Sequence, residues 1–153
     1  MAIDVVDASG ESGLDHDALR SQAAVLLERL RLSPDTDVSI ALVDEEEMAR
    51  LHVTWMDEPG PTDVLSFPMD DLRPGEPGQP LVAGVLGDVI LCPTVAGRQA
   101  EHAGHALDRE CALLLTHGML HLVGYDHAEP EEHARMFALQ DELLAAWWQA
   151  SAP

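Results

Sequence analysis

Three histidines within eleven residues are the feature of this sequence that most directly indicates chemistry. They occur in the segment His-Gly-Met-Leu-His-Leu-Val-Gly-Tyr-Asp-His, which begins at position 117. His117 and His121 are four residues apart, and on a helix such residues lie on one face, so both imidazoles can bind one ion. Gly124 allows the chain to leave the helix in a left-handed conformation, after which His127 can return to the ion. The spacing therefore predicts a metal site with the ligands His117, His121 and His127.

Three imidazole ligands leave one position of a tetrahedral zinc ion open. An open position is typical of catalytic zinc sites, whereas structural sites are closed by four protein ligands. A water held there can have a pKa of about 7, so it is a usable nucleophile at neutral pH. The motif therefore predicts a hydrolase. We expect the remaining histidines to be ordinary surface or core residues: His16, His52, His102, His105 and His133.

The residue after the first histidine of the motif bears on the kind of hydrolase. The spacing matches the metallopeptidase signature H-E-x-x-H-x-x-G-x-x-H, except that Gly118 replaces the glutamate. That glutamate is the general base of the peptidases, and glycine has no side chain that can take a proton. A metallopeptidase is therefore the less favoured alternative.

The whole segment from His117 to His127 resembles the signature H-G-x-L-H-L-x-G-Y-D-H of the YbeY family of bacterial endoribonucleases, also called rRNA maturation factors. Residues 61–68, Pro-Thr-Asp-Val-Leu-Ser-Phe-Pro, resemble the P-T-[DN]-V-L-S-F-P block of that family. Residues 87–91, Gly-Asp-Val-Ile-Leu, resemble its G-D-I-x-I strand. The first two blocks are highly specific, and the resemblance extends over residues 38–148.

The resemblance implies a zinc-dependent endoribonuclease that is specific for single-stranded RNA. Such a protein acts in ribosomal RNA maturation, notably at the 3′ end of small-subunit rRNA, and in ribosome quality control. Its expected cofactor is one Zn²⁺ ion bound by His117, His121 and His127. Its expected partners are single-stranded or precursor rRNA and the small ribosomal subunit with its assembly factors, in the cytoplasm.

One position departs from the family pattern. Many members have an arginine five residues before the proline that opens the second block, and here that position is Met56. A thioether cannot neutralise a phosphate. Either another arginine serves, or this member cleaves differently or poorly. Met56 is also the best support for a further alternative, a non-catalytic, zinc-stabilised ribosome assembly factor.

The sequence offers candidates, but no assured general base, for catalysis. Asp126, Ser66 and Asp63 are the catalytic candidates, since the resemblance implies that the second block lies near the cleft. Asp126 can orient a ligand histidine through its ring N–H, or it can cap the turn after the helix. Asp63 can equally cap the entry to its strand.

The charge of the chain is unusual for a protein that acts on RNA. The net charge is −20, with 28 acidic residues and eight arginines. An acidic surface slows the approach of RNA and lowers non-specific affinity, so the attracting charge must be local. Candidates for substrate binding are Thr62 and three arginines, Arg73, Arg98 and Arg109, because a guanidinium can pair with two phosphate oxygens at once. Each arginine can also be an ordinary surface residue.

The composition predicts one globular domain over residues 1–153, with 46% hydrophobic residues and no run of ~20 apolar residues that could span a bilayer. Because residues 1–7 contain two aspartates and no basic residue, we do not expect them to be a secretory signal. Cys92 and Cys111 are expected to be small buried hydrophobes in a reducing cytoplasm.

Hydrophobic periodicity predicts the elements that must hold these residues. The pattern is strand, helix, strand, helix, strand, strand and three helices. We predict strands from Ile3 and over 38–43, 64–67 and 85–91, helices over 15–32, 44–55, 93–102 and 106–123 and from Pro130, and a surface loop over 70–80. The predicted fold is α/β, a single domain with a small mixed sheet of about four strands, about five or six helices and a metal cleft beside the sheet.

Overall fold

The computed structural model describes residues 3–10, 13–126 and 128–151. The elements follow the predicted order, with four strands and five helices in the described residues. They are β1 (Ile3–Asp7), α1 (His16–Arg29), β2 (Asp37–Leu42), α2 (Glu45–Met56), β3 (Val64–Pro68), β4 (Val85–Leu91), α3 (Pro93–Ala103), α4 (Leu107–Leu122) and α5 (Pro130–Ser151).

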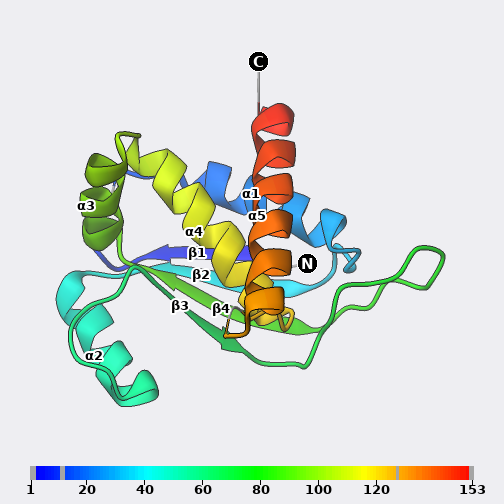
Figure 1. Cartoon of the computed structure of the whole chain (residues 1–153), viewed down its shortest axis with the longest axis horizontal. Coiled ribbons are helices and arrows are strands. Elements are labelled where there is room, and N and C mark those ends of the chain that lie inside the picture. The colour runs from blue at the N-terminus through cyan, green and yellow to red at the C-terminus, as the bar shows by residue number, and fades with distance from the viewer. Residues whose placement is uncertain (1–2, 11–12, 127, 152–153) are drawn as a thin grey trace.

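The strands form one mixed sheet in the order β1-β2-β4-β3 (Figure 1). β1, β2 and β4 are parallel, and β3 pairs antiparallel with β4 at the sheet edge. α2 and α3 lie at the end of the sheet where the three parallel strands finish, and the long loop between β3 and β4 leaves from the opposite end (Figure 1). The predicted α/β fold with a small mixed sheet is confirmed.

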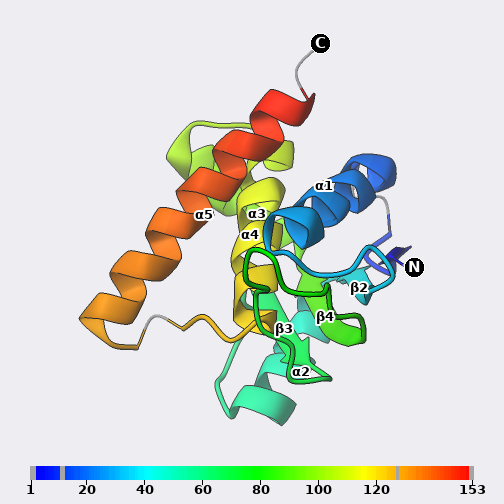
Figure 2. The same cartoon turned by 90° about the vertical axis from the view of Figure 1, so that its right-hand side faces the viewer.

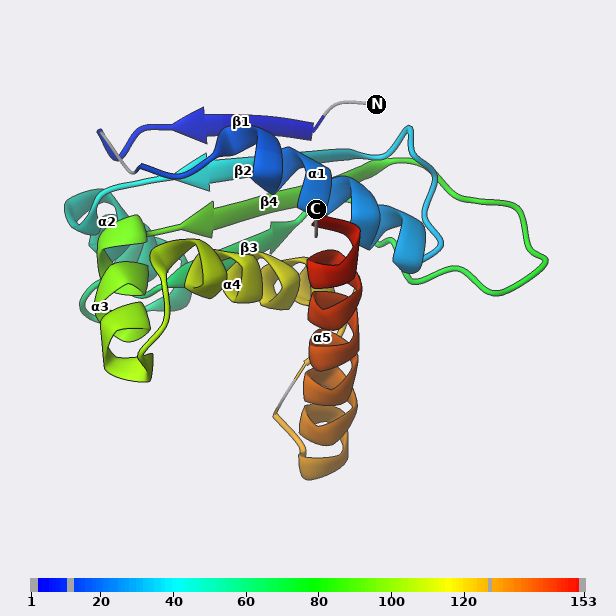
Figure 3. The same cartoon turned by 90° about the horizontal axis from the view of Figure 1, so that it is seen from above.

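The helices α1 and α4 lie along one face of the sheet, and α5 extends away from that face (Figure 3). α5 packs against α4 and α1 (Figure 2). α4 is enclosed by the sheet, α1 and α5, which explains why most of its residues are apolar and buried. Its buried hydroxyl, Thr116, accepts a hydrogen bond from the side-chain amide of Gln22 on α1 at 2.9 Å.

Gly118 allows α4 to approach the sheet closely. A Cβ atom built on Gly118 would lie 2.9 Å from Val89 Cγ1 and 3.1 Å from Ser66 Oγ, closer than ordinary contact. The Ser66 hydroxyl uses this proximity and donates to the Gly118 carbonyl at 2.9 Å. Position 118 therefore faces the sheet, and the neighbouring histidines emerge at its edge.

Helix α1 ends earlier than its apolar pattern predicts. It stops at Arg29 rather than at position 32, because Arg31 adopts a left-handed conformation (φ 58°) and Leu32 forms a bridge with Val82. The predicted loop over 70–80 contains no helix or strand, and it is fastened to this helix end. Leu72 is buried in the core, and the Gly75 N–H donates to the Leu30 carbonyl at 2.9 Å.

Cys92 and Cys111 are both buried free thiols, as predicted. No helix within the described ranges is both long and apolar enough to cross a lipid bilayer.

Candidate metal centre

The last turns of α4 bring His117 and His121 together. Their Nε2 atoms are 3.1 Å apart and their ring planes are inclined by 81°. The predicted third ligand, His127, lies outside the described residues. Within the described ranges, no group of three or more His, Cys, Asp or Glu side chains is arranged to hold a metal ion. The described structure thus contains two of the three predicted ligands, and they are adjacent.

The other ring nitrogen of each histidine has a partner. His121 Nδ1 lies 3.0 Å from the Tyr125 carbonyl oxygen, which can only accept, so Nδ1 carries the proton. The turn at Gly124 (φ 98°) brings this carbonyl back to the ring. His117 Nδ1 lies 2.8 Å from Oε1 of Gln140 on α5. Each ring is therefore held by an acceptor at its Nδ1 atom.

This arrangement fits a metal ion better than a direct hydrogen bond between the rings. With both protons on Nδ1, both Nε2 atoms present lone pairs, and two acceptors cannot bond each other at 3.1 Å. Two nitrogen ligands of a tetrahedral zinc ion, at ~2.0–2.1 Å from the metal, stand about 3.3 Å apart. The donor set and its spacing therefore suit Zn²⁺, and a second partner on each ring is typical of metal-binding histidines.

Gln140 is a site residue that was not predicted from the sequence. It is buried, with 3% of its surface exposed, and it belongs to a different helix from its partner His117. Phe137, one turn earlier on α5, places its ring 5.6 Å from the His117 ring. One sequence signal could have indicated it: Gln140 is a polar residue four positions after Met136, and therefore lies on the same inner face of the helix.

A cleft of about 670 Å³ opens beside the histidine pair. It lies between β3, the end of α2 and the turn after α4. The catalytic candidates Asp63, Ser66 and Asp126 all line this cleft. The other lining residues are Met56, Val64, Leu65, Pro68, His117, His121, Gly124 and Tyr125.

The catalytic candidates differ in how far their polar atoms are already engaged. Ser66 donates its hydroxyl hydrogen to the Gly118 carbonyl. Asp63 accepts from the Val64 N–H at 2.8 Å and from the Thr62 hydroxyl at 3.3 Å, so this carboxylate does cap the entry to β3. Asp126 lines the cleft in the turn that follows α4. Thr62 is not among the lining residues, but its hydroxyl donates to the carboxylate of Asp63, which does line the cleft.

The three candidate arginines lie in different parts of the molecule. Arg98 on α3 pairs with Glu45 of α2 at 2.6 Å. Arg109, in the first turn of α4, lies 5.5 Å from the Trp148 ring, at the opposite end of the helix from His121. Neither is a lining residue of the cleft, whereas Arg73 lies directly against Gly124.

The geometry at position 118 also bears on the peptidase alternative. A side chain at this position would meet Val89, Ser66 and Val64 of the sheet at 2.9–3.3 Å, closer than ordinary contact. A glutamate there would have to displace these neighbours. The close packing of α4 on the sheet therefore disfavours the peptidase glutamate at position 118.

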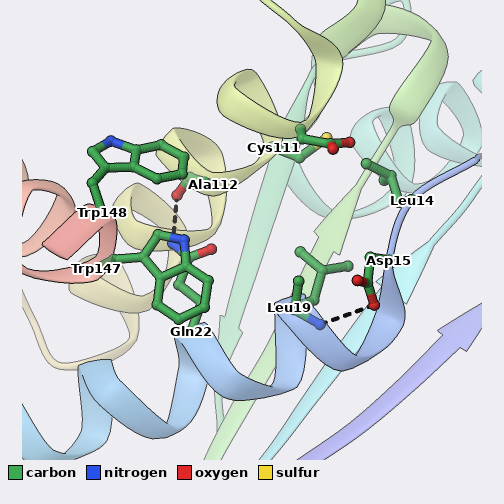
Figure 4. Close-up of a pocket in the computed structure, with 10 residues that line it drawn as sticks. Leu14, Asp15, Leu19, Gln22, Cys111, Ala112, Trp147 and Trp148 are labelled. Carbon is green, nitrogen blue, oxygen red and sulfur yellow. Dashed lines mark hydrogen bonds between the residues drawn. The ribbon is translucent and has the colours of Figure 1, made fainter. Parts of the chain in front are cut away.

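A second hollow, of about 220 Å³, lies between α1, α4 and α5 (Figure 4). Leu14, Leu19, Trp147 and Trp148 give it a mainly apolar lining. Two of its polar groups are engaged: the Gln22 amide donates to the Ala112 carbonyl at 2.7 Å, and Asp15 caps α1. Burial raises the pKa of the Cys111 thiol to about 12, which keeps it protonated and unreactive. This hollow therefore lacks the reactive groups that the histidine cleft has.

Comparison with known proteins gives a consistent result over nearly the whole chain. A family described as endoribonuclease YbeY matches residues 7–148. An endoribonuclease YbeY of Thermobifida fusca is 60% identical over 147 residues, which cover 96% of this chain and 94% of the relative. One of Acidothermus cellulolyticus is 57% identical, with 93% and 90% covered.

A solved structure shares the fold of this chain. The solution structure of TM1509 from Thermotoga maritima superposes with a TM-score of 0.67 at 26% sequence identity. The match covers 97% of this chain and 90% of that protein. The arrangement of sheet and helices is therefore shared with a protein whose sequence has diverged considerably.

Proposed function

This chain belongs to the endoribonuclease YbeY family, and we propose that it is a zinc-dependent endoribonuclease that cuts single-stranded RNA. We further propose that its substrate is precursor rRNA, at the 3′ end of the small-subunit rRNA, and that it serves ribosome quality control. Its partners would then be the small ribosomal subunit and its assembly factors. Two buried, unpaired cysteines suit the reducing cytoplasm in which such work takes place.

The observation that carries the proposal is the histidine pair with its supporting acceptors. The Nε2 atoms of His117 and His121 lie 3.1 Å apart. Both histidines line a cleft that Asp63 and Asp126 also line. His127, five residues after the end of α4, is the proposed third ligand. When bound there, zinc would supply Lewis acidity, which can polarise a phosphodiester or lower the pKa of a water.

The residues of the chain itself would position the reacting groups. Gln140 and the Tyr125 carbonyl hold the two rings in one tautomer and one orientation. The hydrogen bond from the Ser66 hydroxyl to the Gly118 carbonyl connects β3, which follows Asp63, to α4, which carries the two histidines. This bond would help to keep the Asp63 carboxylate at a fixed distance from the histidines. Asp126 and Asp63 are the groups in the cleft that can accept a proton from an attacking water.

Zinc analysis combined with RNA cleavage tests the proposal. We expect the purified protein to contain about one zinc per chain. His121→Ala should lose the metal and cleavage of precursor small-subunit RNA together, because one ligand is removed. His102→Ala, which removes an exposed histidine on α3, should retain both. Wild-type zinc content in His121→Ala would contradict the ligand assignment.

A non-catalytic zinc-stabilised assembly factor is the second candidate function, and Met56 favours it. This residue lines the cleft and contributes no positive charge toward a phosphate. Under this alternative, the protein binds the small subunit and a variant without cleavage activity still restores growth. Cleavage of precursor RNA that depends on His121 would exclude it.

A further inference from the structure

The candidate cleft is poor in positive charge for a site that acts on RNA. Its described lining residues include the carboxylates of Asp63 and Asp126 but no arginine, and the chain contains no lysine. RNA binding relies on contacts between cationic side chains and phosphates. Apart from the proposed metal ion, positive charge for RNA must therefore come from a residue next to the lining.

Arg73 is in the right place to do so. A Cβ built on Gly124 would lie 2.7 Å from Cζ and 2.8 Å from Nε of Arg73, so the guanidinium rests against the bare backbone of this glycine. Gly124 lines the cleft, and its N–H donates to the His121 carbonyl at 3.0 Å. The arginine thus lies at the cleft rim, beside the turn that carries the histidine's carbonyl partner.

The backbone on both sides of this contact is well defined by packing. Leu72 is buried in the core, which fixes the start of the loop that carries Arg73. Gly124 has a φ of 98° and no side chain, so the turn leaves room for the guanidinium. The contact between Arg73 and Gly124 therefore depends on the buried Leu72 on one side and on the absence of a side chain at position 124 on the other.

The guanidinium also has hydrogen-bonding capacity to spare. Its Nη1 donates to the Leu72 carbonyl at 3.1 Å and forms an ion pair with the Asp71 carboxylate at 2.6 Å. Nη1 is the only nitrogen of Arg73 with an acceptor among the residues that the structure describes, which leaves the Nε and Nη2 donors for a ligand. The Arg73 side chain is 58% exposed and that of Asp71 is 85% exposed, so their ion pair is weakly held and can yield to a phosphate.

We infer that Arg73 binds a phosphate group of the RNA strand that enters the cleft. The inference rests on the proposed function, and it adds a substrate-positioning residue to it. Arginine suits this role because its planar fork can contact two phosphate oxygens at once. The phosphate would take Nε and Nη2, while Nη1 keeps its bond to the Leu72 carbonyl.

The test compares Arg73→Ala, Arg73→Lys and Arg20→Ala in the zinc-loaded protein. Arg20 is the matched control, because it is an arginine on α1 whose side chain is 42% exposed and also pairs with a nearby aspartate, Asp17, at 2.6 Å. Binding is measured by fluorescence anisotropy with a 2′-O-methylated single-stranded oligonucleotide over a range of salt concentrations. Cleavage of the unmodified RNA gives KM and kcat separately.

We expect Arg73→Ala to raise Kd and KM about tenfold and to lower the slope of log Kd against log salt by about 0.7, because one phosphate contact is lost. Arg73→Lys should restore the salt slope and part of the affinity. Arg20→Ala should match the wild type. A purely structural role for Arg73 would change the melting temperature but not the salt slope.

The outcomes separate this inference from the proposed function. Equal affinity and equal salt slope in Arg73→Ala and wild type would overturn the role of Arg73, even if the protein cuts RNA. A wild type that binds the oligonucleotide through Arg73 but cuts no RNA would uphold this role and refute the proposed activity.

Discussion

At the scale of single residues, the candidate site depends on which nitrogen of each histidine carries a proton. The Tyr125 carbonyl and the Gln140 amide oxygen fix this choice, and both Nε2 lone pairs consequently face one point. Hydrogen-bond acceptors of this kind fix the tautomer and the orientation of metal-binding histidines, and their loss typically lowers metal affinity about ten- to hundredfold.

Gln140→Leu tests this support. The change keeps the volume and removes the acceptor, so the His117 ring loses its fixed tautomer. We expect zinc affinity to fall about ten- to hundredfold, measured by competition with a chromogenic chelator. Gln140→Glu keeps an acceptor at the same place and should retain most of the affinity. Equal zinc affinity in Gln140→Leu and wild type would show that this hydrogen bond does not support the site.

Residue types and spacing in the sequence were sufficient to predict that His117 and His121 lie side by side, because residues four apart on a helix are a local pattern. The same reasoning could not find Gln140, or the contact between Arg73 and Gly124. Both are tertiary contacts between distant segments, and they depend on how α5 and the long loop pack. Arg98 and Arg109 were chosen for their proximity in sequence, but the fold carries them away from the cleft.

At the scale of elements, the close approach of α4 to the sheet sets the geometry of the cleft. Alternating and helical patterns were enough to predict the order of strands and helices, because each element buries one face. The end of α1 was misplaced, since the apolar Leu30 and Leu32 continue the sequence pattern although Leu32 already pairs with Val82. The left-handed conformation of Arg31 that ends the helix has no signature in the sequence.

Gly118→Ala tests the close approach of α4. The new methyl group would meet Val89 Cγ1 at 2.9 Å, and this side chain is fully buried in a central strand and cannot move aside easily. We expect a loss of about 1–2 kcal/mol in the free energy of unfolding by urea, because this overpacking exceeds the gain in helix propensity.

Gly97→Ala is the matched control for this experiment. It is also a helical glycine, on α3, but its added methyl group would meet only Leu107 Cδ1, at 3.9 Å. We expect this variant to gain about 0.5–1 kcal/mol from helix propensity alone. If both variants gained stability, the packing of α4 on the sheet would not be as tight as the distances indicate.

At the scale of the whole molecule, the net charge of −20 opposes the compact state. Self-repulsion is strongest at low ionic strength, where the Debye length is about 30 Å at 0.01 M and about 8 Å at 0.15 M. Unfolding separates the charges and relieves the repulsion. Salt should therefore stabilise the folded chain.

We expect the melting temperature to rise by several degrees when KCl is increased from about 0.01 to about 0.15 M. Differential scanning fluorimetry measures this shift. Choline chloride should reproduce it, because screening depends on ionic strength and not on a bound potassium ion. A melting temperature that fell with salt would mean that attractive ion pairs outweigh the repulsion.

The origin of Gln140 on α5 has a consequence for biosynthesis. Translation produces α5 after every other described element, so a nascent chain has its histidine helix well before the amide that steadies His117. A ribosome that stalls between the two would hold a polypeptide whose His117 ring is still able to rotate. If the proposed metal site is correct, full metal affinity would be acquired only after the final helix has left the exit tunnel and docked, so the chain would become active only after its release from the ribosome.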